Sequence, residues 1–274
     1  SGIFNIGIGQ GALCSNTTGQ HNTASGYMSL KSNTTAQQNT AYGQMTLYAN
    51  TTGSQNTAVG TVAMLCNTTG TENVATGYCA LVKNTTGSCN TASGSHALYA
   101  NTTGASNTAG GICALYSNTT GCRNTATGMY SLRANTTGLY NTASGYAALY
   151  VSTTGAANTA SGYKALMTNT TANYNTAYGA LALCGTTSSN YNVAIGSCAL
   201  SVNSTGEKNT AMGHATLRAS TGNLNTGIGW AALLNTTASS NTAVGACSLF
   251  DNTTGAYNTA SGYKALMTNT TASE

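Results

Sequence analysis

Residues that could carry out chemistry are few in this chain, and they do not form a catalytic pattern. Among its 274 residues, the histidines and acids fall at unrelated places: His21, His96, His214, Glu72, Glu207, Asp251 and Glu274. A nucleophile, its base and an orienting group must lie within hydrogen-bond reach of one another. The sequence therefore predicts that the protein is not an enzyme. It assigns no catalytic, cofactor-binding or metal-binding residue.

The nine cysteines do not suggest redox or metal chemistry either. Their number is odd, so at least one cannot pair within the chain. No C-x-x-C motif occurs, which disfavours a zinc site and a thioredoxin-like centre. We interpret the cysteines as small side chains that fill variable positions.

Asparagine–threonine triplets are the most frequent motif with a chemical meaning, because N-x-T is the acceptor pattern for N-glycosylation. Thirteen asparagines match it: Asn16, Asn33, Asn50, Asn67, Asn84, Asn101, Asn118, Asn135, Asn169, Asn203, Asn235, Asn252 and Asn269. The alternative is that Asn and Thr build a turn and its hydrogen-bonded ladder. Glycans about 4.8 Å apart along one edge would crowd each other. The sequence therefore favours the turn, with partial occupancy or O-linked sugar on Thr as the other possibilities.

Composition excludes two classes of partner. Charged residues make up 4% of the chain, against about 25% in a typical soluble domain. The net charge is +4, and the eight basic residues are scattered without the cluster expected of a nucleic-acid-binding protein. Every apolar run is shorter than the roughly 18 residues that cross a bilayer, so we expect no membrane span in this chain.

A 17-residue repeat positions all of these residues. Its commonest form is N-T-A-x-G-x-x-A-L-x-x-N-T-T-G-x-x, and we number its positions as slots 1 to 17. Sixteen repeats begin at residues 5, 22, 39, 56, 73, 90, 107, 124, 141, 158, 175, 192, 209, 225, 241 and 258. A fixed short period predicts a solenoid. Two repeats are one residue short, at Ser220–Gly222 and around Asn235, so the N-T-T-G segment is predicted to be a turn.

The slots predict how each repeat folds. Slot 1 is always Asn, slot 5 is always Gly, and slot 9 is Leu except at Met64. Alternation along slots 1 to 5 predicts a strand whose Asn, Ala and Gly face inward, and slots 8 and 9 are expected to begin a second strand. An invariant glycine implies a positive φ or a close backbone approach. Structural glycines of this kind include Gly26, Gly43, Gly60, Gly77, Gly94, Gly128, Gly145 and Gly162.

Residues 1–274 are therefore expected to form one continuous all-β array, a parallel β-solenoid of about 16 repeats. One Leu and a few Ala per repeat make a small core against the entropy of ordering the chain. Either the repeats reinforce each other through ladders or several chains share a core, and we expect the second, with three chains. Neither end has an atypical capping repeat, so the array is expected to be a fragment of a longer fibre or one subunit of a filament.

Aromatic residues gather in two variable slots. Slot 10 holds Tyr48, Tyr99, Tyr116, Tyr150 and Phe250, and slot 6 holds the candidates for a chain-to-chain seam or a sugar-binding row: Tyr27, Tyr78, Tyr146, Tyr163, Trp230 and Tyr263. Aromatic rings on a surface serve either role. The sequence favours the seam.

The run from Asn192 to Leu200, N-V-A-I-G-S-C-A-L, resembles the head repeats of YadA-type trimeric autotransporter adhesins. Residues 56–60 and 241–245 match similarly, and the longer form is similar to repeat arrays of phage tail fibres. The resemblance implies a trimeric left-handed parallel β-roll. The present repeats are longer by the N-T-T-G turn, and no neck, stalk or anchor is found in the chain.

These observations predict a structural protein, the shaft of an extracellular, cell-surface or virion fibre that self-associates as a homotrimer or a filament. The first alternative is a surface module that binds glycans or carries them. The third choice of function is an ice-binding β-solenoid, because Thr recurs at slots 2, 13 and 14. Scattered large and small residues in slot 4 argue against the flat face that ice binding needs.

Overall fold

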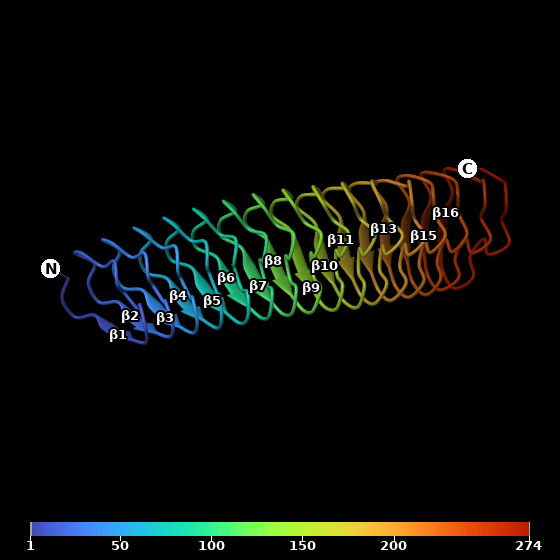
Figure 1. Ribbon diagram of the computed structural model, residues 1–274. Helices are drawn as coiled ribbons and strands as arrows, with labels where there is room; N and C mark the ends of the chain where they lie inside the picture. The colour runs from blue at the N-terminus through green and yellow to red at the C-terminus, as the bar shows by residue number, and fades with distance from the viewer. Residues whose placement is uncertain (1, 274) are drawn as a thin grey trace. The chain divides into compact units, whose positions relative to one another are not determined.

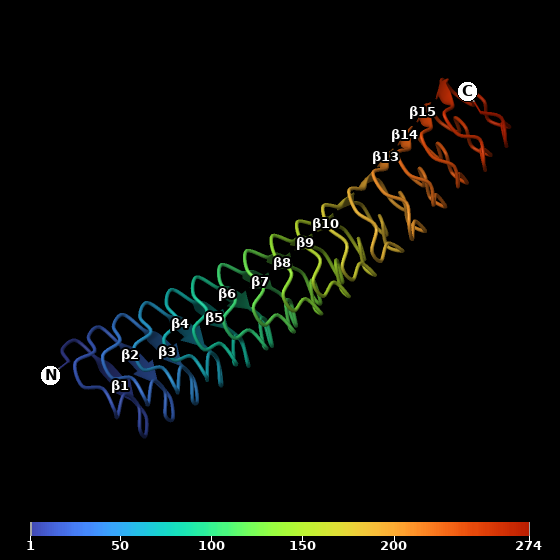
Figure 2. The ribbon, with the colours of Figure 1, turned by 90° about the horizontal axis from the view of Figure 1, so that it is seen from above.

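The computed structural model describes residues 2–273 and divides into two compact units, Ser1–Leu139 and Tyr140–Glu274, which we describe separately. In each unit the backbone winds into a stack of coils, and each coil corresponds to one repeat (Figure 1). The view from above shows the coils of each unit in sequence order (Figure 2). The described residues contain strands and turns but no helix. The predicted all-β parallel solenoid is confirmed.

Each coil contributes one strand of three residues, at slots 2 to 4. The strands of the first unit are β1 (Ile6–Ile8), β2 (Thr23–Ser25), β3 (Thr40–Tyr42), β4 (Thr57–Val59), β5 (Val74–Thr76), β6 (Thr91–Ser93), β7 (Thr108–Gly110) and β8 (Thr125–Thr127). Those of the second unit are β9 (Thr142–Ser144), β10 (Thr159–Ser161), β11 (Thr176–Tyr178), β12 (Val193–Ile195), β13 (Thr210–Met212), β14 (Thr226–Ile228), β15 (Thr242–Val244) and β16 (Thr259–Ser261). Within each unit, neighbouring strands pair in parallel and equivalent slots lie opposite each other, as Ala41 does to Ala58.

The predicted alternation along the strand is confirmed. In the fourth coil Asn56 and Ala58 are fully buried, whereas Thr57 and Val59 are exposed. Successive side chains of a strand point to opposite faces, so alternation over only three strand residues decides which side chains of the coil face the core. The N-T-T-G segment is also a bend, as predicted.

The expected second strand is wrong. Slots 6 to 11 form consecutive turns, and slots 7 and 9 adopt left-handed backbone, as at Met45 (φ 53°) and Leu47 (φ 51°). The amide of Met45 donates to the Tyr27 carbonyl of the preceding coil at 2.8 Å, whereas that of Leu47 donates to the Ala63 carbonyl of the next coil at 3.1 Å. Left-handed residues cost roughly 1–2 kcal/mol each. The hydrogen bonds to both neighbouring coils and the burial of Leu47 offset that cost.

A single chain encloses its own core. The slot-9 side chains of the inner coils, such as Leu98 and Leu115, have no exposed surface, and the slot-8 alanines Ala97 and Ala114 are equally buried. The Leu and Ala side chains therefore do not form the core shared by three chains that the sequence led us to expect. Any assembly of chains must use outer surfaces.

Two columns of buried asparagine run through the coils. In the first Asn ladder, at slot 1, Asn56 Oδ1 accepts the Asn73 backbone amide at 3.0 Å and the Asn73 side-chain amide at 3.1 Å. In the second Asn ladder, at slot 12, the Asn67 side-chain amide donates to Asn50 Oδ1 at 2.8 Å. Buried amides are stabilising only when they are hydrogen-bonded, and in the first unit the ladders meet that condition except at Asn135 Oδ1.

The second Asn ladder distinguishes the two units. In the first unit each slot-12 Asn from 33 to 135 donates to the one before it. In the second unit shorter side chains interrupt the column: Ser152, Thr186, Ser220 and Thr236. Three of their hydroxyls, those of Ser152, Ser220 and Thr236, are buried with no hydrogen-bond partner among the described residues.

We expect Thr186→Asn to stabilise the second unit. Asn169 and Asn203 lie one coil to either side of Thr186 and instead use their Oδ1 atoms within their own turns, at 3.0 Å to the Ala172 amide and 2.7 Å to the Gly206 amide. An amide at 186 would join them, with a net gain of about 1 kcal/mol. Denaturant unfolding and hydrogen exchange across residues 165–210 would measure it. Thr187→Asn, on the exposed face of the same turn, is the control, and an equal effect of both variants would contradict the prediction.

Candidate functional site

Several of the titratable residues considered for catalysis make local contacts instead. His21 stacks on Phe4 with ring centroids 5.2 Å apart, and Glu207 accepts a hydrogen bond from the Asn190 side-chain amide at 3.0 Å. Glu72 accepts one from the Cys89 thiol at 3.6 Å. Glu274 lies outside the described residues. Within residues 2–273, His, Cys, Asp and Glu form no group of three or more that could hold a metal ion.

Burial disfavours thiolate formation at two cysteines. All nine cysteines are free. Burial, reinforced by the nearby Cys198 thiol, raises the pKa of the Cys184 thiol. Burial also raises the pKa of the Cys89 thiol, and the Glu72 carboxylate adds to that effect. The thiolate is the nucleophilic form, so neither side chain is activated at neutral pH.

No helix long and apolar enough to cross a membrane is found in the part of the chain that the structure describes.

The structure places the glycosylation candidates in the second Asn ladder. Ten of them are buried: Asn33, Asn50, Asn67, Asn84, Asn101, Asn118, Asn135, Asn169, Asn203 and Asn252. Asn16 and Asn269 are partly exposed, and Asn235 is exposed because Thr236 takes the inner position of its shortened coil. A glycan on a buried amide would have to be attached before folding and would remove the ladder. The geometry therefore favours Asn235 as an acceptor in the folded protein.

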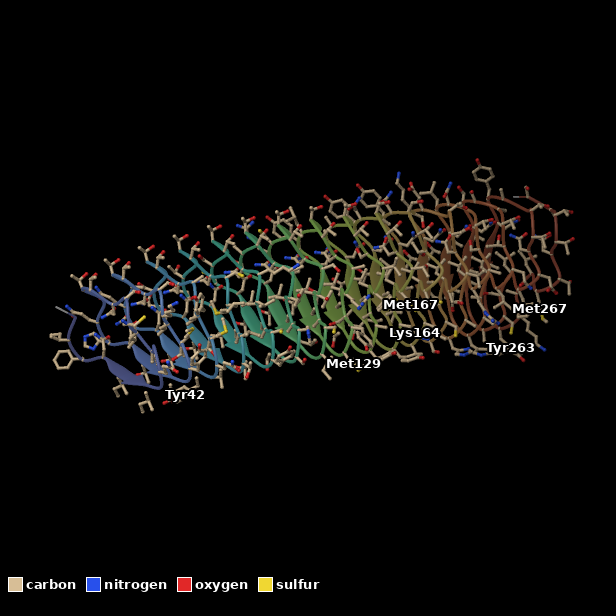
Figure 3. The ribbon with its side chains drawn as sticks, viewed as in Figure 1. Tyr42, Met129, Lys164, Met167, Tyr263 and Met267 are labelled. Carbon is tan, nitrogen blue, oxygen red and sulfur yellow. The ribbon has the colours of Figure 1, made fainter. Side chains whose placement is uncertain are left out.

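The slot-6 aromatic residues all lie on the outside of the coils. Tyr27, Tyr78, Tyr146, Tyr163, Trp230 and Tyr263 are 41–73% exposed. Tyr146 and Tyr163 stack with centroids 5.7 Å apart, and Lys164 Nζ lies 5.0 Å from the centre of the Tyr163 ring. Figure 3 labels Lys164 and Tyr263 along the outer edge of the second unit. These positions are open to a partner chain and to a sugar.

A denser group of aromatic and basic side chains lies in the first unit, over four successive coils. We call it the aromatic–basic cluster, and it consists of Tyr78, Lys83, His96, Tyr99, Tyr116 and Arg133. The Tyr99 and Tyr116 rings are stacked 4.9 Å apart and 4° from parallel. The aromatic slots of the sequence identify Tyr78, Tyr99 and Tyr116 but give no reason to join them to Lys83, His96 and Arg133. These three lie at slots 7, 10 and 11 of a turn that the sequence did not predict.

The outer face of the sheet, formed by slots 2 and 4, carries no charged residue in either unit. In the second unit five consecutive strands place an apolar residue at slot 4 of this face: Tyr178, Ile195, Met212, Ile228 and Val244. Each is 39–48% exposed. In the first unit the same slot is mostly small or polar from β5 to β8, with Thr76, Ser93, Gly110 and Thr127. We call the five residues the apolar row.

Comparison with family models, with curated proteins and with solved structures finds no significant match to this chain.

Proposed function

We propose that the chain is a structural shaft in an extracellular fibre or filament, of the adhesin or virion tail-fibre kind, without enzymatic activity. The first Asn ladder carries this proposal, because it is continuous within each unit. Each coil is joined to the next by backbone hydrogen bonds and by a buried amide such as that of Asn107, which donates to Asn90 Oδ1 at 3.2 Å. Bending or stretching a unit must break several of these bonds together, which makes the stack stiff.

Self-association through the outer face of the sheet is part of the proposal, with a second copy of the chain as the partner. Exposed apolar area in a contiguous patch favours a protein interface. The apolar row supplies such a patch, and the absence of charge from slots 2 and 4 of the described coils means that two copies meet without like-charge repulsion. A homotrimer or a filament formed in this way leaves each chain's core intact.

Sedimentation of the purified chain tests this assembly. We expect wild-type protein to associate with rising concentration, and Ile195→Lys combined with Met212→Lys to weaken that association at least tenfold. Two charges on adjacent coils would have to be desolvated in the interface. Thr76→Lys combined with Ser93→Lys introduces the same charges at exposed slot-4 positions outside the apolar row. A monomeric wild type, or equal weakening by both variants, would refute assembly through this face.

Glycan binding is the second candidate function, because the side chains of the slot-6 tyrosines are exposed in both units. Binding on a glycan array that is abolished by Tyr146→Ser with Tyr163→Ser would support it. The Thr column at slot 2, which is exposed at Thr91, Thr108 and Thr125, is the observation that favours ice binding. The large apolar row beside that column disfavours it.

A further inference from the structure

Two cations and two tyrosine rings form a column in the aromatic–basic cluster. Lys83 belongs to the fifth coil, Tyr99 to the sixth, Tyr116 to the seventh and Arg133 to the eighth. Lys83 Nζ lies 5.1 Å from the centre of the Tyr99 ring, and Arg133 Cζ lies 5.4 Å from that of Tyr116. Because the coils stack in order, the two cations lie at opposite ends of the ring pair.

His96 joins this column to Tyr78. Its ring lies 5.5 Å from Tyr99 and 6.3 Å from Tyr116, and it meets Tyr78 edge-on at 5.3 Å. The Ser95 hydroxyl is 2.8 Å from His96 Nδ1 and orients the imidazole. The cluster is therefore a packed surface of rings rather than a set of independent side chains.

The first unit has one acidic residue against four basic ones. Glu72 is the only acidic residue of the first unit, and it occupies slot 17, whereas the cluster lies on slots 6 to 11. Across both units six of the eight basic residues share slots 7 to 11: Lys31, Lys83, Arg133, Lys164, Arg218 and Lys264. This edge of the coil is thus a basic surface, and it attracts anions.

The ring faces are not available for stacking on a ligand. Tyr99 and Tyr116 cover one face of each other, and Lys83 and Arg133 cover the outer two. Proteins that bind single-stranded nucleic acid stack bases on open ring faces and follow a backbone that carries one charge per nucleotide. Here only two cations lie along four coils, three coil spacings or about 14 Å apart. The cluster suits a ligand with sparse anionic groups and many hydroxyls.

We propose that the aromatic–basic cluster binds an anionic polysaccharide. Lys83 and Arg133 pair with its carboxylate or sulfate groups, and the hydroxyls of Tyr99 and Tyr116 hydrogen-bond to sugar hydroxyls between them. Guanidinium and ammonium groups bind such anions by charge-assisted hydrogen bonds. The site is independent of the structural role proposed above, since a shaft without this cluster would retain its ladders.

Binding of the whole chain to four immobilised polymers tests the site. Polygalacturonate carries carboxylates, dextran sulfate carries sulfates, dextran is neutral, and oligothymidylate represents nucleic acid. We expect one or both anionic polysaccharides to bind, more weakly as salt rises, and dextran not to bind. Equal binding of dextran, or tighter binding of oligothymidylate that depends on Lys83 and Arg133, would overturn the proposal. So would the absence of binding to either anionic polysaccharide.

Matched variants separate this site from general electrostatic attraction. Lys83→Gln with Arg133→Gln should weaken polysaccharide binding at least tenfold, whereas Arg123→Gln with Lys208→Gln, which removes the same charge from exposed slot-17 positions outside the basic surface, should leave it unchanged. Tyr99→Phe with Tyr116→Phe keeps the rings and should weaken binding several-fold. Equal losses from the two charge variants would overturn the proposal, and unchanged binding of the Phe variant would refute the role of the hydroxyls. Unaltered circular dichroism would show that each variant is folded.

Discussion

Replacing Gly111 by alanine is expected to destabilise the first unit by about 3 kcal/mol or more, while the same change at the adjacent Gly110 is expected to be harmless. Gly111 has φ +132°, and a Cβ there would lie 2.7 Å from the Gly128 carbonyl carbon and 2.8 Å from its oxygen. These are backbone atoms of the next coil, so they cannot rotate away. Gly110 ends β7 on the outer face, and its nearest contact would be Thr127 Cγ2 at 3.8 Å.

Denaturant unfolding and hydrogen exchange of the two alanine variants would measure this difference. Gly262→Ala is a second control, because Gly262 has φ +125° but nothing lies within 4 Å of its added Cβ. That variant reports the backbone strain alone, so its loss of stability should be smaller than that of Gly111→Ala. If Gly111→Ala and Gly110→Ala unfold at the same denaturant concentration, slot 5 does not require glycine for contact with the next coil.

The second large effect is expected at the first Asn ladder, where Asn56→Ala should cost roughly 3 kcal/mol. The Asn56 side-chain amide donates to Asn39 Oδ1 at 3.2 Å and to the Gly70 carbonyl at 2.9 Å. Its Oδ1 accepts the backbone and side-chain amides of Asn73. Alanine would leave the buried Asn73 backbone amide without its acceptor, which costs more than the net value of a hydrogen bond.

Hydrogen exchange should locate the damage. We expect amides of residues 56–89 to lose protection in Asn56→Ala, because the coils on either side of the gap separate there first. Thr57→Ala changes the neighbouring residue on the exposed face of β4 and is the matched control. Full protection of the Asn73 amide in Asn56→Ala would show that the ladder is not what holds these coils together.

The sequence predicts the repeat and its inward residues because side chains alternate between the two faces of a strand. It predicts the N-T-T-G turn because turns tolerate deletions. Asn56, Ala58 and Gly60 lie at every second position, so any strand through them must place them on one face. The two short repeats mark the turn because a strand that pairs on both sides cannot lose a residue without shifting its register. These features need no knowledge of the neighbouring coils.

The tertiary structure alone decides the conformation of slots 6 to 11. Leu47 adopts left-handed backbone because its amide must reach the carbonyl of the next coil and its side chain must fill the interior, and neither partner is adjacent in sequence. The closed single-chain core follows from that turn. The column of Lys83, Tyr99, Tyr116 and Arg133 also follows from that turn. These residues extend over 50 positions of the sequence and meet only because successive coils bring equivalent turns into contact.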